Sequence, residues 1–118
     1  MKKIFSYNMK GIDFEPVTLP INSTILGVKD IYGVPTLFAL VDPDETREEI
    51  VAIRRFRTGI PIKNAIEGMR YLDSMLEANF GTVFHFFQEG ARTVVNIGAV
   101  PPSFEQLRAL GGADQSVN

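Results

Sequence analysis

Hydrophobic and polar residues alternate in short runs along most of the chain, and glycine, proline and asparagine separate the runs. Such alternation over about four to eight residues is typical of half-buried β-strands. Gly33, between two apolar runs, predicts a hairpin turn over residues 32–35. The pattern predicts strands over residues 4–9, 14–20, 25–31, 36–41, 50–57, 82–88 and 92–100.

Two of these runs depart from simple alternation. The run over residues 14–20 contains Pro16 and Pro20, and because proline cannot donate to a ladder, we expect an edge strand there. The run TLFALV over residues 36–41 is apolar on both faces, which is typical of a strand that is central or covered on both sides. It is the strongest core prediction in the chain.

Residues 63–81 fit two structures. As a helix, with Asn64 as N-cap and Gly81 just beyond the end, the segment places four apolar residues in one stripe: Ala65, Met69, Leu72 and Leu76. As a strand, residues 70–76 place the two leucines on one face. Gly68 opposes the helix by about 1 kcal/mol relative to alanine, whereas periodicity alone slightly favours it.

The C-terminal region has a helix signature. Ser103 and Gln106 form a capping box, and a glycine pair follows an apolar stripe made of Phe104, Leu107 and Leu110. We therefore expect a mainly β or α+β fold, a small antiparallel sheet or barrel-like domain with a short C-terminal helix. The predicted parts are a β-rich domain (1–88), a strand–helix extension of the same domain (89–112) and a flexible tail (113–118).

Composition narrows the class of protein. The 118 residues, 45% of them hydrophobic and 22% charged, fit one globular domain. A net charge of −2 provides no general attraction for nucleic acid or membranes. The absence of cysteine excludes disulfides, thiol catalysis and cysteine zinc sites. The N-terminal residues 1–14 lack the apolar core of a signal peptide, so we expect a soluble, cytoplasmic protein that does not enter the membrane.

Several motifs together resemble a family of short uncharacterised phage and bacterial proteins. They are LPINSTILGVKD, VPTLFALVDPD, TGIPI, RYLDSM and TVFHFF, and the resemblance extends over residues 3–88. VPTLFALVDPD and VFHFF are the most specific of them. The resemblance implies a small β-rich domain without assigned chemistry, and it favours a strand over residues 70–76. It also implies a phage or prophage setting within a bacterial host cell.

The chain departs from the family pattern at two places. The family loop reads GTGHPI, and Ile60 stands here in place of its histidine. Any acid–base role of that histidine is therefore lost in this protein. The segment after Gln88 extends beyond the end of the pattern and is a plausible place for dimer contacts.

A basic cluster is the first candidate site. Five positive charges lie within residues 54–70, opposed only by Glu67. Arginine suits phosphate recognition, and glycine allows close backbone approach to an anion. The residues of this anion- or partner-binding hypothesis are Arg54, Arg55, Arg57, Thr58, Gly59 and Lys63. Strand alternation, however, separates Arg54 from the next two arginines, and the acidic loop over residues 42–49 offers partners. A solvated, ion-paired strand end is therefore the favoured interpretation.

Three further features have ordinary explanations. His85 has no local orienting partner, so we interpret it as a packed structural histidine on the strand face opposite its phenylalanine neighbours. The acidic loop lacks the glycine and ligand spacing of a calcium loop, so we expect a solvated turn and no metal. An aromatic set that could stack on bases is better explained as core: Phe80, Phe84, Phe86 and Phe87.

These observations favour a non-enzymatic accessory protein that needs no cofactor. Its partner would be a host or phage protein, bound through a sheet edge or the C-terminal extension, and the chain would also form a homodimer. The alternative is a small phosphate-, nucleotide- or nucleic-acid-binding module that uses the corner over residues 54–59. A hydrolase using His85 and a carboxylate is a third, weaker hypothesis.

Overall fold

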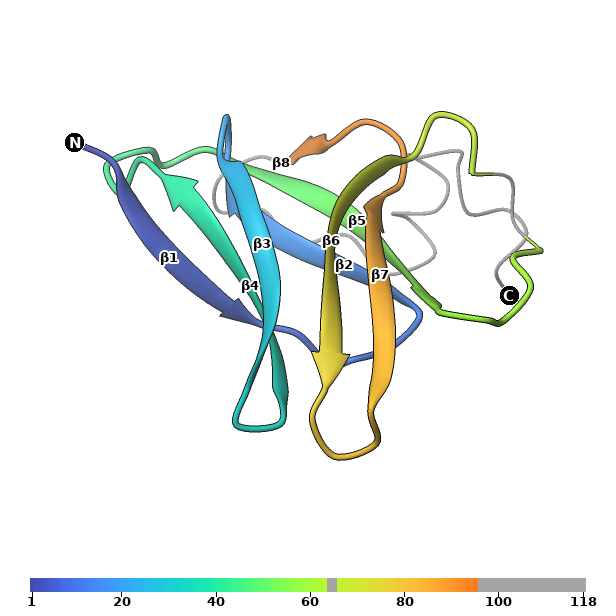
Figure 1. Ribbon diagram of the computed structural model, residues 1–118. Helices are drawn as coiled ribbons and strands as arrows, with labels where there is room; N and C mark the ends of the chain where they lie inside the picture. The colour runs from blue at the N-terminus through green and yellow to red at the C-terminus, as the bar shows by residue number, and fades with distance from the viewer. Residues whose placement is uncertain (64–65, 96–118) are drawn as a thin grey trace.

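The computed structural model describes residues 1–63 and 66–95, which form two antiparallel β-sheets (Figure 1). No helix occurs within these residues. The strands are β1 (Lys3–Asn8), β2 (Phe14–Pro20), β3 (Thr24–Ile31), β4 (Val34–Val41), β5 (Glu48–Arg57), β6 (Arg70–Glu77), β7 (Thr82–Gln88) and β8 (Thr93–Val95).

The first sheet has the strand order β1-β4-β3, and the second has the order β2-β5-β7-β6. β2 pairs with β5 over residues 48–54, so β7 and the short β8 share the other edge of β5. The chain changes sheet after β1, after β2 and after β4, which interleaves the two sheets along the sequence. The barrel-like prediction is wrong for the described part of the chain, because the end strands of the two sheets pair neither on one side (β1 and β2) nor on the other (β3 and β6).

The core lies between the two sheets and follows from alternation along the strands. Residues at every second position of β4 and β5 point inward, so their aliphatic side chains meet those of β2 and β7. Burial of each contributes roughly 1.5–3 kcal/mol. The largest fully buried side chains are Phe86, Leu19, Leu37, Ile53, Val28, Val41 and Val51.

One carboxylate joins the two sheets where β3 and β6 lie side by side (Figure 1). Asp73 Oδ2 accepts hydrogen bonds from the backbone nitrogen of Val28 at 2.8 Å and from Lys29 Nζ at 2.9 Å. Each strand has a register irregularity at this point, before Gly27 in β3 and before Asp73 in β6. A Cβ on Gly27 would lie 2.6 Å from Asp73 Oδ2, so glycine permits the close approach.

The structure confirms most of the predicted strands and decides the ambiguous segment. Residues 70–77 form β6, so the helix interpretation is wrong for them. The irregularity before Asp73 also corrects the strand interpretation. Leu72 packs against the core, whereas Leu76 is exposed on the outer face, so the two leucines do not share one side. β2 is an end strand, as its prolines predict.

Three other expectations have mixed outcomes. β4 is the central strand of its sheet, and its inward side chains are fully buried, but Phe38 and Leu40 on the outer face are partly exposed. The acidic loop is shorter than predicted, because β5 begins at Glu48. Only residues 93–95 of the predicted strand over 92–100 are described as strand. The predicted helix over 101–112 and the tail over 113–118 lie outside the described residues.

Candidate functional site

Arg54 is buried on the outer face of the second sheet. Its guanidinium donates to Glu89 Oε2 from Nε and from an NH2 group, each at 2.8 Å, and both side chains are about 4% exposed. The guanidinium carbon also lies 4.8 Å from the ring centroid of Phe14, which adds a cation–π contact. These contacts make Arg54 part of a buried ion pair.

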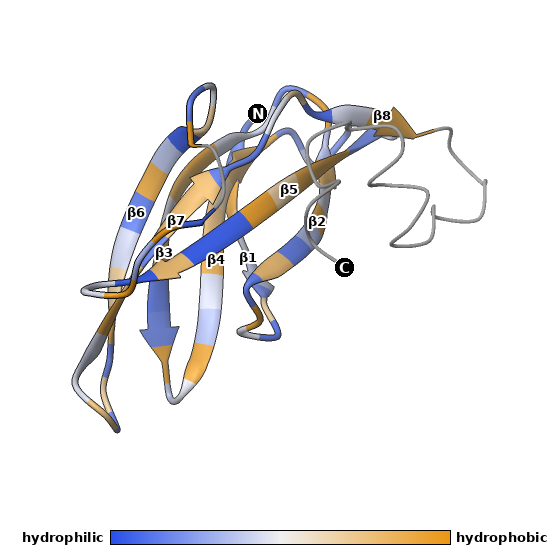
Figure 2. Cartoon of the chain, turned by 90° about the vertical axis from the view of Figure 1, so that its right-hand side faces the viewer, coloured by the Kyte–Doolittle hydropathy of each residue, from blue (hydrophilic) through white to orange (hydrophobic). Residues whose placement is uncertain are grey.

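Arg55 and Arg57 share the opposite face of β5, as alternation predicts. The guanidinium carbon of Arg55 lies 4.1 Å from the ring centroid of Phe84, and that of Arg57 lies 5.9 Å from the same centroid. Arg55 also pairs with Asp13 at 3.1 Å. Within the described residues Arg54 therefore pairs with Glu89 and Arg55 with Asp13, neither of which belongs to the acidic loop over residues 42–49. The arginines form the hydrophilic stretch that Figure 2 shows in blue near the end of β5.

The remaining residues of the predicted anion site form a strand-to-loop corner. The backbone nitrogen of Thr58 donates to the carbonyl of Val83 at 3.0 Å, so this amide is already engaged. Gly59 has a φ of 85°, a left-handed conformation that glycine adopts without strain. Lys63 is exposed. The structure thus places Arg54 on one face and Arg55 on the other, and it does not gather the six residues around one cradle.

His85 has two partners that local sequence could not reveal. Its Nε2 lies 2.7 Å from Thr58 Oγ1, and its Nδ1 lies 3.2 Å from the hydroxyl of Tyr71. The Tyr71 ring packs edge-on against Phe87 at a centroid distance of 5.1 Å. Both polar partners are neutral hydroxyls, which lack the negative charge that stabilises an imidazolium in a Ser–His–Asp arrangement. These contacts are compatible with the structural role that we expect for His85.

The predicted aromatic set divides between three environments. Phe84 and Phe86 are buried between the sheets, which confirms the core interpretation for these two. Phe87 lies on the outer face beside Tyr71. Phe80 is 79% exposed at the β6–β7 turn, so the core prediction is wrong for it. Phe80 is therefore an exposed aromatic residue at the tip of the β6–β7 hairpin.

The acidic loop is held by its own turn contacts. Asp42 Oδ1 accepts from the backbone nitrogen of Asp44 at 3.0 Å. Hydrogen bonds from the Arg47 side chain and backbone lower the pKa of the Glu45 carboxyl to about 2. Among residues 1–63 and 66–95, no group of three or more histidine, aspartate or glutamate side chains is arranged to hold a metal ion.

The β3–β4 hairpin ends in an unusual two-residue turn. Tyr32 and Gly33 have φ values of 51° and 85°, the pattern of a type I′ turn. Asparagine is the favoured first residue of such turns, because a left-handed conformation costs most other residues roughly 1–2 kcal/mol. The Tyr32 side chain is nevertheless fully exposed and gains no packing in return. Strain of this kind is a reason to suspect function.

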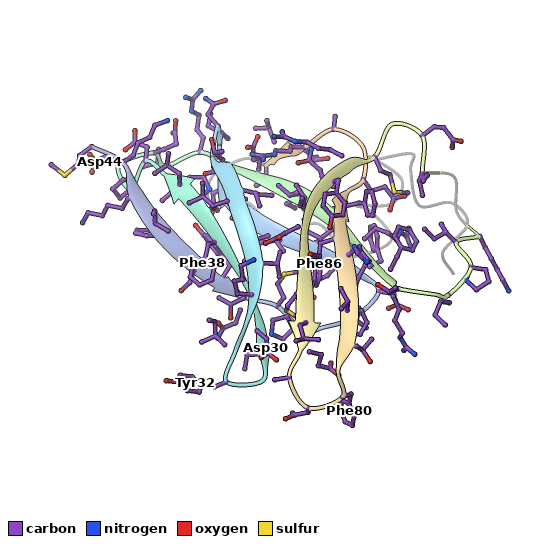
Figure 3. The ribbon with its side chains drawn as sticks, in the orientation of Figure 1. Asp30, Tyr32, Phe38, Asp44, Phe80 and Phe86 are labelled. Atoms are coloured by element: carbon purple, nitrogen blue, oxygen red, sulfur yellow. The ribbon has the colours of Figure 1, made fainter. Side chains whose placement is uncertain are left out.

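The β6–β7 hairpin ends at the same side of the molecule and is tied to the first hairpin by Asp30 (Figure 3). Asp30 Oδ1 accepts from the backbone nitrogen of Gly33 at 2.7 Å, and Oδ2 accepts from that of Ala78 at 3.1 Å. One carboxylate therefore fixes the two turns relative to each other. In Figure 3 Tyr32 and Phe80 both extend away from the sheets at this end.

The exposed apolar residues around these turns form one candidate site, here called the tip surface. Its aliphatic members lie on the outer faces of the two different sheets, so the two aromatic rings at the turns are its defining part. Sequence reasoning predicted the hairpin turn but assigned Phe80 to the core. The conformation of Tyr32 and the tie from Asp30 depend on contacts that a local pattern does not contain. The tip surface consists of Ile31, Tyr32, Val34, Leu76 and Phe80.

Within the described part of the chain there is no helix of the length and apolarity needed to cross a membrane. Neither the curated proteins nor the solved structures contain a match to this chain. A family model described as a domain of unknown function (DUF7352) matches residues 1–96, which include all eight strands of the described residues. The chain therefore belongs to this family, DUF7352.

Proposed function

We propose that the chain is a non-catalytic binding protein that docks onto a partner protein through the tip surface. The observation that carries the proposal is Tyr32, which is fully exposed and held in a left-handed conformation. A residue that costs stability and packs against nothing described is best explained by a contact made in a complex. Aromatic side chains are also the residues that dominate binding energy at protein interfaces.

The rigidity of the tips supports the same function. Because Asp30 binds both turns, the side chains of Tyr32 and Phe80 are carried on a common support. A preorganised surface loses less conformational entropy on binding than two independent loops do. We place the protein in the cytoplasm of a bacterium, encoded by a phage or prophage, because its motifs resemble those of phage and bacterial proteins.

The anion-binding alternative at the corner over residues 54–59 has less support. Arg54 and Arg55 already pair with Glu89 and Asp13, and the Thr58 hydroxyl contacts His85. An anion would have to compete with these contacts. An enzymatic function has no comparable observation in its favour, because the groups on the ring nitrogens of His85 are neutral.

Site-specific cross-linking tests the proposal. The change Phe80→p-benzoylphenylalanine places a photoreactive group at the tip, and the full chain is then irradiated in a lysate of the bacterium that carries the gene. Mass spectrometry identifies the linked protein, which is purified for affinity measurements. We expect one dominant cross-linked product that is absent when the same group replaces Leu26, which is exposed on β3 away from the tip surface.

The affinity measurements then use matched variants. Tyr32→Asn keeps the turn and removes the aromatic ring, and Phe80→Ser removes the second ring. Each is expected to weaken the Kd about 30-fold or more, since an aromatic hot spot contributes at least about 2 kcal/mol. Leu26→Ser is the control and should leave the Kd unchanged. If both tip variants bind like the control, the tip surface is not the docking site.

A further inference from the structure

A groove of about 560 Å³ opens between β1 and β2, the two end strands that do not pair with each other. Its walls come from Ser6, Tyr7 and Asn8 of β1, from Lys10, and from residues 15–18 of β2. None of these residues belongs to the tip surface. The groove is therefore a separate surface from the one to which the function above is assigned.

Glu15 brings a buried negative charge to this groove. It is 5% exposed, and its two carboxylate oxygens accept the backbone N–H of Lys10 at 2.9 and 2.8 Å. Glu15 pairs with Ile53 in the ladder, so its side chain is on the inward face of the second sheet. No cationic side chain pairs with it within the described residues. A buried carboxylate gains most from a cation that approaches through the groove.

β1 contains a cationic residue, Lys3, and has one edge that pairs with no other described strand. In the ladder with β4, Lys3, Phe5 and Tyr7 lie opposite Val41, Ala39 and Leu37, whose side chains are fully buried between the sheets. Directly opposed residues point to the same side, so Lys3, Phe5 and Tyr7 point inward. β4 covers one edge of β1, and no other described strand pairs with it. Ile4 and Phe5 remain 62% and 39% exposed, which is the surface of an edge that a second strand would cover.

The facing strand is a poor alternative for pairing. β2 contains Pro16 and Pro20, which lack an N–H, whereas β1 contains no proline and has the strand formers Ile4, Phe5 and Tyr7. Of the two strands that border the groove, only β1 is therefore free of the prolines that block edge pairing. β1 is the edge to which another strand can add.

We propose that two copies of this chain associate through β1, antiparallel across a two-fold axis that passes beside Phe5. This register places Phe5 opposite the Phe5 of the second copy and Lys3 opposite its Tyr7. Because Tyr7 and Glu15 line the same groove, the Lys3 ammonium of each copy reaches the Glu15 carboxylate of the other. The contact is self-complementary, as a two-fold interface must be, and each copy completes a charge pair in its partner's groove.

Charge reversal tests the assignment in the full chain by sedimentation velocity over a concentration series. The sedimenting mass of the wild type is expected to be about twice the 13.1 kDa of one chain. Lys3→Glu should weaken the dimer at least tenfold, because it sets two carboxylates against each other. Lys2→Glu changes the same charge one position earlier, on the other face, and should have a much smaller effect. The double change Lys3→Glu with Glu15→Lys should restore association.

A single cysteine tests the register, since the chain contains none. Directly opposed residues on paired strands have Cβ atoms about 4.5–5.5 Å apart, which suits a disulfide after a small adjustment. Phe5→Cys should therefore form a disulfide-linked dimer under mild oxidation much faster than Phe80→Cys at the tip. A wild type that stays monomeric up to millimolar concentration overturns the proposal. So does a dimer that Lys3→Glu and Lys2→Glu affect equally, or equal oxidation rates for the two cysteine variants.

Discussion

Asp73 of β6 accepts a hydrogen bond of 2.8 Å from the backbone nitrogen of Val28 in β3, and this bond joins the two sheets on one side. The same carboxylate also binds Lys29 Nζ and the backbone nitrogen of Ser74. No ladder joins the sheets here or on the opposite side, between β1 and β2. Asp73 is therefore the contact whose loss should most directly separate the sheets.

Asp73→Ala is expected to lower the free energy of unfolding by about 2–4 kcal/mol. The change leaves the backbone nitrogen of Val28, which is itself fully buried, without its acceptor, and charged hydrogen bonds contribute more than neutral ones. Denaturant unfolding at neutral pH measures the loss. Asp13→Ala is the control, because Asp13 is an exposed carboxylate, and a loss as large for it would contradict the argument.

Asp73 also predicts a dependence of stability on pH. Burial raises the pKa of its carboxyl, but hydrogen bonds from Val28, Lys29 and Ser74 outweigh burial and hold the pKa below the ordinary value of 3.8. A group whose pKa is lower in the folded protein stabilises it above the unfolded pKa, and this stability is lost as the pH falls through the folded value. We expect the difference in stability between wild type and Asp73→Asn to shrink as the pH falls below 3.8. A difference that is constant over the acid range would contradict this.

Gly27 and Asp73 should be coupled energetically. A methyl group at Gly27 would lie 2.6 Å from Asp73 Oδ2, so Gly27→Ala must displace the carboxylate that binds Val28. We expect Gly27→Ala to destabilise the protein when Asp73 is present and to do so much less in Asp73→Ala. A double-mutant cycle from denaturant unfolding measures the coupling, which should be about 1–3 kcal/mol. Additive effects would show that the two positions act independently.

The buried ion pair of Arg54 and Glu89 should contribute more to the free energy of unfolding than the pair of Arg55 with the exposed Asp13. Arg54→Met keeps the packing on Phe14 but leaves the buried Glu89 carboxylate without this partner, which should cost about 3–5 kcal/mol. Arg55→Met is the matched control in the next position. Its partner Asp13 is exposed to water, so the loss should be about 1 kcal/mol or less. Equal losses in thermal or denaturant unfolding would contradict the assignment.

The sequence predicts the strands well because alternation is a local property. It predicts β6 poorly for a physical reason, since the irregularity between Tyr71 and Asp73 interrupts the two-residue period. Leu72 and Leu76 are therefore spaced as in a helix while they face different sides of a sheet. The family resemblance correctly favoured a strand over a helix for residues 70–76, but it did not predict that Leu72 and Leu76 face different sides of the sheet.

The candidate sites were less predictable because their contacts join distant positions. Arg54 is 35 residues from Glu89, and Asp30 is 48 residues from Ala78. Neither separation leaves a periodic signal. The composition predicts that most phenylalanines are buried, but it does not identify Phe80 as an exposed one at a turn. The pairing of the arginines and the exposure of the tips follow only from the way the two sheets pack.

Tyr32→Asn is expected to stabilise the protein even though it removes a large side chain. Tyr32 has a φ of 51° and packs against nothing described, whereas asparagine adopts this conformation readily and Asn-Gly is the favoured type I′ pair. The gain should be about 1 kcal/mol, seen as a higher denaturant midpoint at an unchanged m-value. Gly33→Ala, at a φ of 85°, should shift the midpoint in the opposite direction. If Tyr32→Asn lowers the midpoint, the tyrosine has a role in folding, and the inference that its strain serves binding loses its basis.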